Sequence, residues 1–239
     1  MQTAPRPPAV ASSPAIALPP KVVALGDSTV YGYGDAVNGG WTEGLRRHWM
    51  AQGISGPVLY NLGVRGDGVK QVFQRLETEF SCRGELRNQV PDVIILSVGT
   101  NDSARLGHAG GRNFTAFETF EQTVSQLLEQ SLQLAPVYFI GMPPVDEGRM
   151  PFAHCLYYSH QDQFRYKEAT RRACRAYQVP YLDIFDLWMQ HMKTEGLSWL
   201  REHLLDDGLH PNSRGYSKIL SQVMGWEALK IGTANDFGS

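Results

Sequence analysis

Short apolar stretches alternate with longer amphipathic ones along most of this chain, and this alternation constrains the fold more than any other feature. Apolar stretches with the length and composition of strands lie at 21–25, 58–62, 93–98, 137–142 and 180–185. Amphipathic stretches with the apolar spacing of helices lie at 41–52, 68–80, 114–134, 161–177 and 213–229. This order predicts an α/β fold with a mostly parallel sheet and right-handed crossover connections.

The alternation continues without an internal repeat or an interior linker, so residues 21–231 are expected to form one domain. The chain has 239 residues, enough to bury a sizeable core without disulfides. Residues 1–20 hold six of the 14 prolines and a single charged residue, which predicts a disordered tail rich in proline and alanine. Residues 232–239 are expected to form a flexible C-terminal tail.

Charge and hydropathy exclude several classes of protein. A formal net charge of −2 offers no broadly basic surface for nucleic acid. The longest apolar runs are far too short for a membrane span, and the N-terminal segment lacks the pattern of a signal peptide. The three cysteines form no metal-binding or redox pair. We therefore expect a cytoplasmic protein with free thiols and no stable membrane insertion, whose oligomeric state these features leave open.

Polar, glycine-containing turns follow three predicted strands and precede the last predicted helix. They lie at 26–29, 61–67, 99–102 and 206–212. Ligands of parallel sheets bind at the carboxyl ends of the strands, where the first three turns would meet. Together the four turns supply serine, asparagine, aspartate, histidine and backbone N–H groups, which are the parts of a serine acyl-transfer site.

Each of these residue types has a chemical role in acyl transfer. A serine hydroxyl needs a base to accept its proton, and the base needs a carboxylate to orient it. Ser28 is the candidate nucleophile and His210 the candidate base, with an aspartate three residues earlier in the same turn. The amides of Ser28 and Gly66 and the side-chain amide of Asn101 are candidate donors to the oxyanion.

The four motifs, in this order, resemble the four blocks of the SGNH hydrolases, also called GDSL-type esterases and lipases, over about residues 21–229. The resemblance implies a flavodoxin-like, three-layer α/β/α sandwich with a five-stranded parallel sheet. It also implies the triad Ser28, Asp207 and His210, because the family pattern Asp-x-x-His-Pro selects Asp207 over Asp206. The implied oxyanion hole consists of Ser28, Gly66 and Asn101.

Two details refine this resemblance. Thr29 stands where the commonest family signature has leucine, which leaves the subfamily open. No Gly-x-Ser-x-Gly sequence surrounds Ser28, which disfavours hydrolases with a nucleophile elbow.

Simpler structural roles are also open for these residues: Ser28 could cap the following helix, and Asn101-Asp102 could form a plain turn. Asp27 and Asp102 are expected to be structural.

The substrate is the least determined part. The loop at 143–159 carries the candidate substrate-pocket residues Met150, Phe152, His154, Leu156 and Tyr157; alternatively, this loop's apolar side chains pack it onto the domain. The expected reaction is hydrolysis of a small-molecule carboxyl ester, short in its acyl chain, through an acyl-enzyme, with no metal or organic cofactor. A carbohydrate O-acetyl esterase, a thioesterase or lysophospholipase, and a degenerate binding module remain alternatives.

Overall fold

A five-stranded parallel sheet forms the centre of the protein. The computed structural model describes residues 19–53, 56–83, 90–229 and 231, so most of the predicted N-terminal tail and the whole C-terminal tail lie outside the described residues. The sheet has the order β2-β1-β3-β5-β7, and its strands are β1 (Lys21–Gly26), β2 (Val58–Gly63), β3 (Val93–Ser97), β5 (Val137–Ile140) and β7 (Tyr181–Leu182). This order is the flavodoxin-like one, and it confirms the predicted α/β fold.

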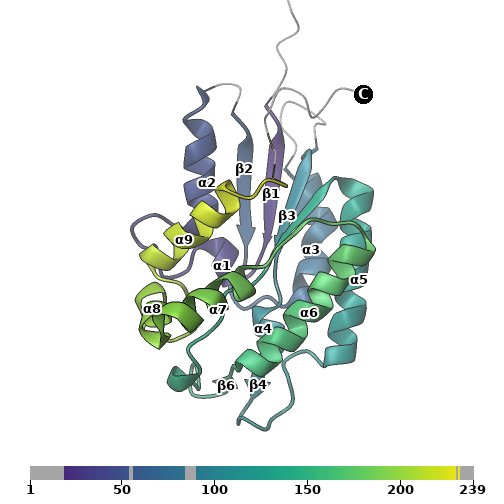
Figure 1. Cartoon of the computed structure of the whole chain (residues 1–239). Coiled ribbons are helices and arrows are strands. Elements are labelled where there is room, and N and C mark those ends of the chain that lie inside the picture. The colour runs from purple at the N-terminus through teal and green to yellow at the C-terminus, as the bar shows by residue number, and fades with distance from the viewer. Residues whose placement is uncertain (1–18, 54–55, 84–89, 230, 232–239) are drawn as a thin grey trace, which may run out of the picture.

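Helices cover both faces of the sheet, which makes three layers (Figure 1). One face carries α3 (Val69–Ser81), α5 (Phe117–Leu134) and α6 (His160–Ala176). The other carries α2 (Gly40–Met50), α7 (Ile184–Glu195), α8 (Leu197–His203) and α9 (Ser213–Met224). The short helices α1 (Ser28–Tyr31) and α4 (Thr100–Ser103) follow β1 and β3 directly.

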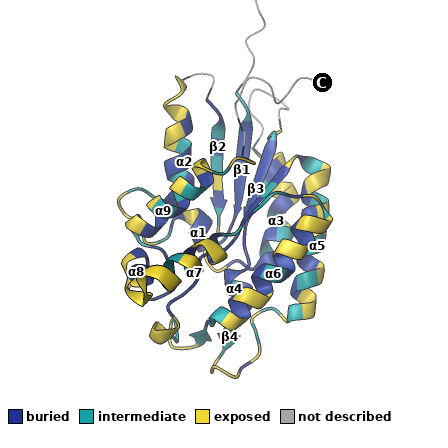
Figure 2. Cartoon of the chain, viewed as in Figure 1, coloured by how far each residue is buried: buried dark blue, intermediate teal, exposed yellow. Residues whose placement is uncertain are grey.

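The central strands are buried on both faces, as their nearly continuous apolar sequences predict (Figure 2). Side chains alternate along a strand, so Val23 and Leu25 pack with α3 and α5, while Val22 and Ala24 pack with α2 and α9. Alternate side chains of the same strands therefore contribute to two apolar clusters, one on each face of the sheet. Full burial of one such aliphatic side chain stabilises the fold by about 1.5–3 kcal/mol.

The last strand is shorter than the sequence predicts. The apolar stretch 180–185 suggests one strand, but β7 ends at Leu182 and Ile184 begins α7. Asp183 is the reason, because its side chain accepts a hydrogen bond from the Asp186 amide and caps the helix. The final helix also ends early, at Met224 rather than near residue 229.

The register of the sheet brings the motif turns together. Gly26, the last residue of β1, pairs with Gly63 of β2 on one side and with Ser97 of β3 on the other. The three strands thus end at the same level, and their following turns lie at one edge of the sheet. A two-stranded sheet of β4 (Arg105–Leu106) and β6 (Leu156–Tyr157) lies beyond this edge (Figure 1). None of the described helices is both long and apolar enough to span a bilayer.

Candidate active site

Ser28, His210 and Asp207 form a continuous chain of close polar contacts at this edge of the sheet. Ser28 Oγ lies 3.0 Å from His210 Nε2, and His210 Nδ1 lies 2.7 Å from Asp207 Oδ2. An ionised carboxylate can only accept, so the proton of a neutral His210 belongs on Nδ1. Nε2 is then free to accept the proton of the Ser28 hydroxyl.

Ser28 does not cap the helix that follows it. It is the first residue of α1, and the preceding Asp27 is the cap, since its side chain accepts hydrogen bonds from the Thr29 amide and hydroxyl. The capping role considered for Ser28 is therefore wrong, and its hydroxyl is directed to His210 instead. Burial raises the pKa of the Asp27 carboxyl, while the hydrogen bonds from Thr29 oppose that rise.

The turn that carries His210 is held by Asp207 and by the start of α9. Asp207 Oδ1 accepts hydrogen bonds from the backbone amides of Leu209, at 2.9 Å, and His210, at 3.0 Å. Burial alone would raise the pKa of Asp207, but the hydrogen bonds from the His210 ring and from these amides outweigh burial and lower it. Gly208 has φ +71°, a left-handed conformation that favours glycine in this tight turn. Asp207 is thus kept ionised beside the imidazole.

Hydrogen bonds join the two segments that directly follow the first and last motif turns. Ser213, at the start of α9, donates its hydroxyl to Asp35 in the loop after α1. Tyr216 donates to the backbone carbonyl of Tyr33 at 3.0 Å. Ser28 and His210 are separated by 182 residues in the sequence, and these contacts link the segments that carry them.

Two of the three candidate oxyanion donors, Gly66 and Asn101, lie in the turns after β2 and β3, and the third, the Ser28 amide, lies at the start of α1. Gly66 has φ +84°, a left-handed conformation that favours glycine, and a Cβ atom there would meet nothing within 4 Å. Asn101 belongs to α4, and its Nδ2 donates to the carbonyl of Asp67 at 2.9 Å. An asparagine amide has two N–H donors, so one remains for a ligand. Both turns lie at the edge of the sheet where β1 ends and Ser28 follows.

Two charged groups hold these turns in place. Arg75 of α3 donates to the Asp67 carboxylate at 2.8 Å and to the carbonyl of Gly26 at 2.9 Å, which joins the first two turns. Asp102 accepts the Val69 amide and the Thr115 hydroxyl. Burial raises the pKa of Asp102 to about 6, against the opposing effect of these hydrogen bonds. Asp102 thus has the structural contacts expected of it.

The candidate pocket residues of the loop are placed in different surroundings. Met150 and Leu156 pack with Phe152 onto a small buried cluster of Ala104, Val145, Tyr158 and Leu209. Of the five candidates, only Phe152 also has a ring contact with the triad, its centroid lying 5.5 Å from that of His210. His154 is exposed in a left-handed turn with φ +63°, and Tyr157 lies half-buried in β6. The loop therefore packs mostly onto the domain.

Sequence reasoning missed several neighbours of the triad. The Tyr33 ring meets the His210 ring edge-on, with centroids 4.5 Å apart, and the Arg65 guanidinium lies 3.9 Å above Tyr33. Arg149 donates to both the carbonyl and the carboxylate of Asp206, so Asp206 is turned outward, away from the imidazole. Only the position of Tyr33, five residues after Ser28 and just beyond the end of α1, offered a signal in the sequence.

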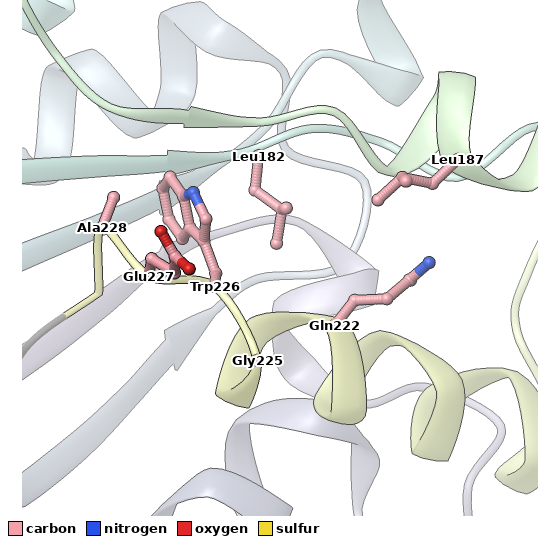
Figure 3. A pocket seen from close by; sticks show the side chains of 7 residues that line it. All are labelled: Leu182, Leu187, Gln222, Gly225, Trp226, Glu227 and Ala228. Atoms are coloured by element: carbon pink, nitrogen blue, oxygen red, sulfur yellow. The ribbon is translucent and has the colours of Figure 1, made fainter.

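Two other features are separate from this site. Among the described residues, the carboxylates of Glu168, Asp183 and Asp186 lie close enough to share a cation. The Lys167 ammonium already contacts all three, at 3.0, 2.8 and 2.6 Å, and supplies that positive charge. A surface pocket contains none of the triad (Figure 3) and is lined by Leu182, Leu187, Gln222, Gly225, Trp226, Glu227 and Ala228.

Comparison with solved structures gives the same fold. The chain is similar to a lipase/acylhydrolase from Enterococcus faecalis, with 23% identity, a TM-score of 0.67, and coverage of 85% of this chain and 93% of that one. It is also similar to a variant of an acetyl xylan esterase from Geobacillus stearothermophilus, with 17% identity, a TM-score of 0.62, and coverage of 85% and 93%. At these identities the likeness shows the fold.

Comparison with family models identifies the chain more specifically. A search of curated proteins gives no significant match. The model of the GDSL-like lipase/acylhydrolase family matches residues 24–218, which contain all four motif turns. The match covers most of the chain, from the first strand into the last helix. The chain therefore belongs to the GDSL-like lipase/acylhydrolase family of hydrolases.

Proposed function

We propose that the protein is a serine ester hydrolase that acts through an acyl-enzyme intermediate. The observation that carries the proposal is the contact chain from Ser28 Oγ through the His210 ring to Asp207, with steps of 3.0 and 2.7 Å. Two catalytic mutants of the Geobacillus acetylxylan esterase, in which a serine and a histidine respectively are replaced by alanine, are consistent with this chemistry in a similar fold.

The reaction follows from the atoms in contact. Ser28 Oγ attacks the ester carbonyl carbon while its proton passes to His210 Nε2, and the ionised Asp207 stabilises the resulting imidazolium. The carbonyl oxygen becomes an oxyanion, to which the Ser28 amide, the Gly66 amide and Asn101 Nδ2 act as donors. Collapse breaks the bond to the alcohol oxygen, and His210 returns the proton to it. Water then attacks the acyl-enzyme through the same steps, releasing the acid and free Ser28.

The packing of the loop at 143–159 favours an ester with a short acyl chain as the substrate. Met150 and Leu156, which could have lined a long apolar channel, are used to anchor the loop to Ala104 and Leu209. The rings of Tyr33 and Phe152, which meet the His210 ring, are the aromatic walls beside the catalytic atoms. With the apolar side chains of the loop used in this way, we infer an acetyl or similarly short acyl group as the substrate's acyl part.

A carbohydrate O-acetyl ester is the second candidate substrate. Several of the similar solved structures are variants of one acetylxylan esterase, the Geobacillus enzyme, whose reaction removes the same small acyl group from a sugar hydroxyl. Both candidates share the acyl-enzyme, and they differ only in the alcohol. Turnover of acetylated xylan at a kcat/KM well above that of p-nitrophenyl acetate would favour the carbohydrate substrate.

The test combines labelling with a substrate series. The protein is incubated with a fluorophosphonate and digested for peptide mass spectrometry, with Ser28→Ala as the matched control. The label is expected on Ser28 and absent from the variant. p-Nitrophenyl acetate, butyrate and octanoate are expected to be turned over with kcat/KM falling along the series. A protein that neither takes up the label nor hydrolyses any of these esters would refute the proposal.

A further inference from the structure

The amide of Asn101 is held at both ends. Its Nδ2 donates to the Asp67 carbonyl at 2.9 Å, and its Oδ1 accepts the hydroxyl of Tyr158 at 3.3 Å. A backbone carbonyl can only accept, so the first contact determines that nitrogen, and not oxygen, occupies that side. The second contact satisfies the oxygen and leaves one N–H of Asn101 for the substrate.

Tyr158 comes from a part of the chain outside the four motif turns. It lies at the end of the loop after β5, 57 residues from Asn101, and is 3% exposed. Its ring packs in the cluster with Ala104, Val145 and Leu209, so the ring cannot turn away without opening that cluster. Burial raises the pKa of the phenol, which keeps its proton and remains a donor.

A hydrogen bond donated to Oδ1 has two consequences for the other end of the amide. It draws electron density toward the oxygen, which makes the Nδ2 hydrogens better donors. It also opposes rotation of the amide plane, which would move the free N–H away from the developing oxyanion. Preorganised donors are effective because they need not reorient during the reaction.

Resting on the hydrolase function proposed above, we propose that Tyr158 is a positioning residue for catalysis: its hydroxyl orients and polarises the Asn101 amide toward the oxyanion. Tyr158 itself touches neither the substrate nor Ser28 in this role. Because the oxyanion is absent from the bound substrate and develops only during the reaction, the contribution of Tyr158 belongs to kcat and leaves KM unchanged.

The experiment is a double-mutant cycle on p-nitrophenyl acetate, with kcat expressed per site titrated by the fluorophosphonate. Tyr158→Phe keeps the ring and removes only the hydroxyl, so kcat is expected to fall about tenfold, the equivalent of one lost hydrogen bond, with KM unchanged. In an Asn101→Ala background the same change is expected to have almost no effect, since the amide it orients is gone.

The matched control is Tyr166→Phe. Tyr166 is also fully buried, and its hydroxyl donates to the Thr115 carbonyl, so its loss lowers the melting temperature without changing kcat. Tyr158→Met, which removes the hydroxyl together with the ring, is expected to lower kcat per titrated site at least as much as Tyr158→Phe.

The outcomes separate this inference from the proposed function. A wild-type protein that takes up no fluorophosphonate and hydrolyses no ester overturns both. An active wild type whose kcat is unchanged by Tyr158→Phe overturns the role of Tyr158 alone. A tenfold loss that persists in the Asn101→Ala background also overturns it, because the hydroxyl would then act through some other group. An equal fall in kcat for Tyr166→Phe also overturns the role of Tyr158, because loss of stability alone would then explain the lower kcat.

Discussion

Asp207→Asn tests the electrostatic design of the triad most directly. The two carboxylate oxygens of Asp207 have different partners. Oδ1 accepts hydrogen bonds from two backbone amides, and Oδ2 accepts a hydrogen bond from the His210 ring. In an asparagine only one of these atoms remains an acceptor. The two backbone N–H groups together outweigh the single N–H of the His210 ring as donors to this acceptor. The side-chain carbonyl oxygen of the asparagine therefore stays with the backbone amides, and its NH2 group turns to His210 Nδ1.

That arrangement gives the imidazole the wrong tautomer. An NH2 group donates to Nδ1, so the ring proton moves to Nε2, which then cannot accept the proton of Ser28. The expected loss in kcat is about 10⁴-fold, the size known for the same change in chymotrypsin-like triads, or roughly 5 kcal/mol of transition-state free energy. Folding is little affected, because the amide contacts of the turn are kept.

Asp206→Asn is the matched control one residue away. The Asp206 side chain is fully exposed, and its ion pair with Arg149 at 2.8 Å faces solvent. An exposed pair of this kind adds little to stability and has no path to the imidazole, so kcat is expected to stay within about twofold of wild type. Both variants are assayed on p-nitrophenyl acetate at saturating substrate near neutral pH. Equal losses in the two, or less than about a tenfold loss for Asp207→Asn, would refute the reasoning.

Three further variants test the surrounding roles. Ser28→Ala should abolish labelling while the melting temperature, followed by circular dichroism, stays near that of wild type, because Asp27 supplies the helix cap; a large drop would assign Ser28 a structural role. Asn101→Ala should lower kcat by ~10²–10³, and a change confined to KM would remove it from the oxyanion hole. The pKa of Asp102 in the folded protein is about 6, above the usual carboxyl value. Between about pH 4 and about pH 7 the folded state therefore binds more protons than the unfolded state. The free energy of unfolding falls as pH rises through this range, by about 3 kcal/mol through this group. Urea unfolding of Asp102→Asn should lack that decline, whereas parallel pH profiles of wild type and variant would contradict it.

Much of the fold follows from local pattern. The apolar stretch 93–98 corresponds to β3, and the spacing of Val72, Leu76 and Phe80 corresponds to the buried side of α3. The pattern failed at 180–185, where a polar cap at Asp183 converts an apolar strand ending into a helix start. Hydrophobicity marks which residues are buried, whereas a single side-chain hydrogen bond decides whether they are helical or extended.

The sequence by itself determined the order of the five sheet strands, the four motif turns and the local pairing of Asp207 with His210, since these depend on residues a few positions apart. It did not predict the helices α7 and α8 between the last strand and the last helix. Only the tertiary structure decided which residues meet across long separations. It placed Ser28 against His210, and Tyr158 against Asn101. It also decided that Met150 and Leu156 anchor the loop, while Phe152 and Tyr33 face the His210 ring. Apolar side chains favour burial without specifying a partner, so these contacts depend on the packing of the whole chain.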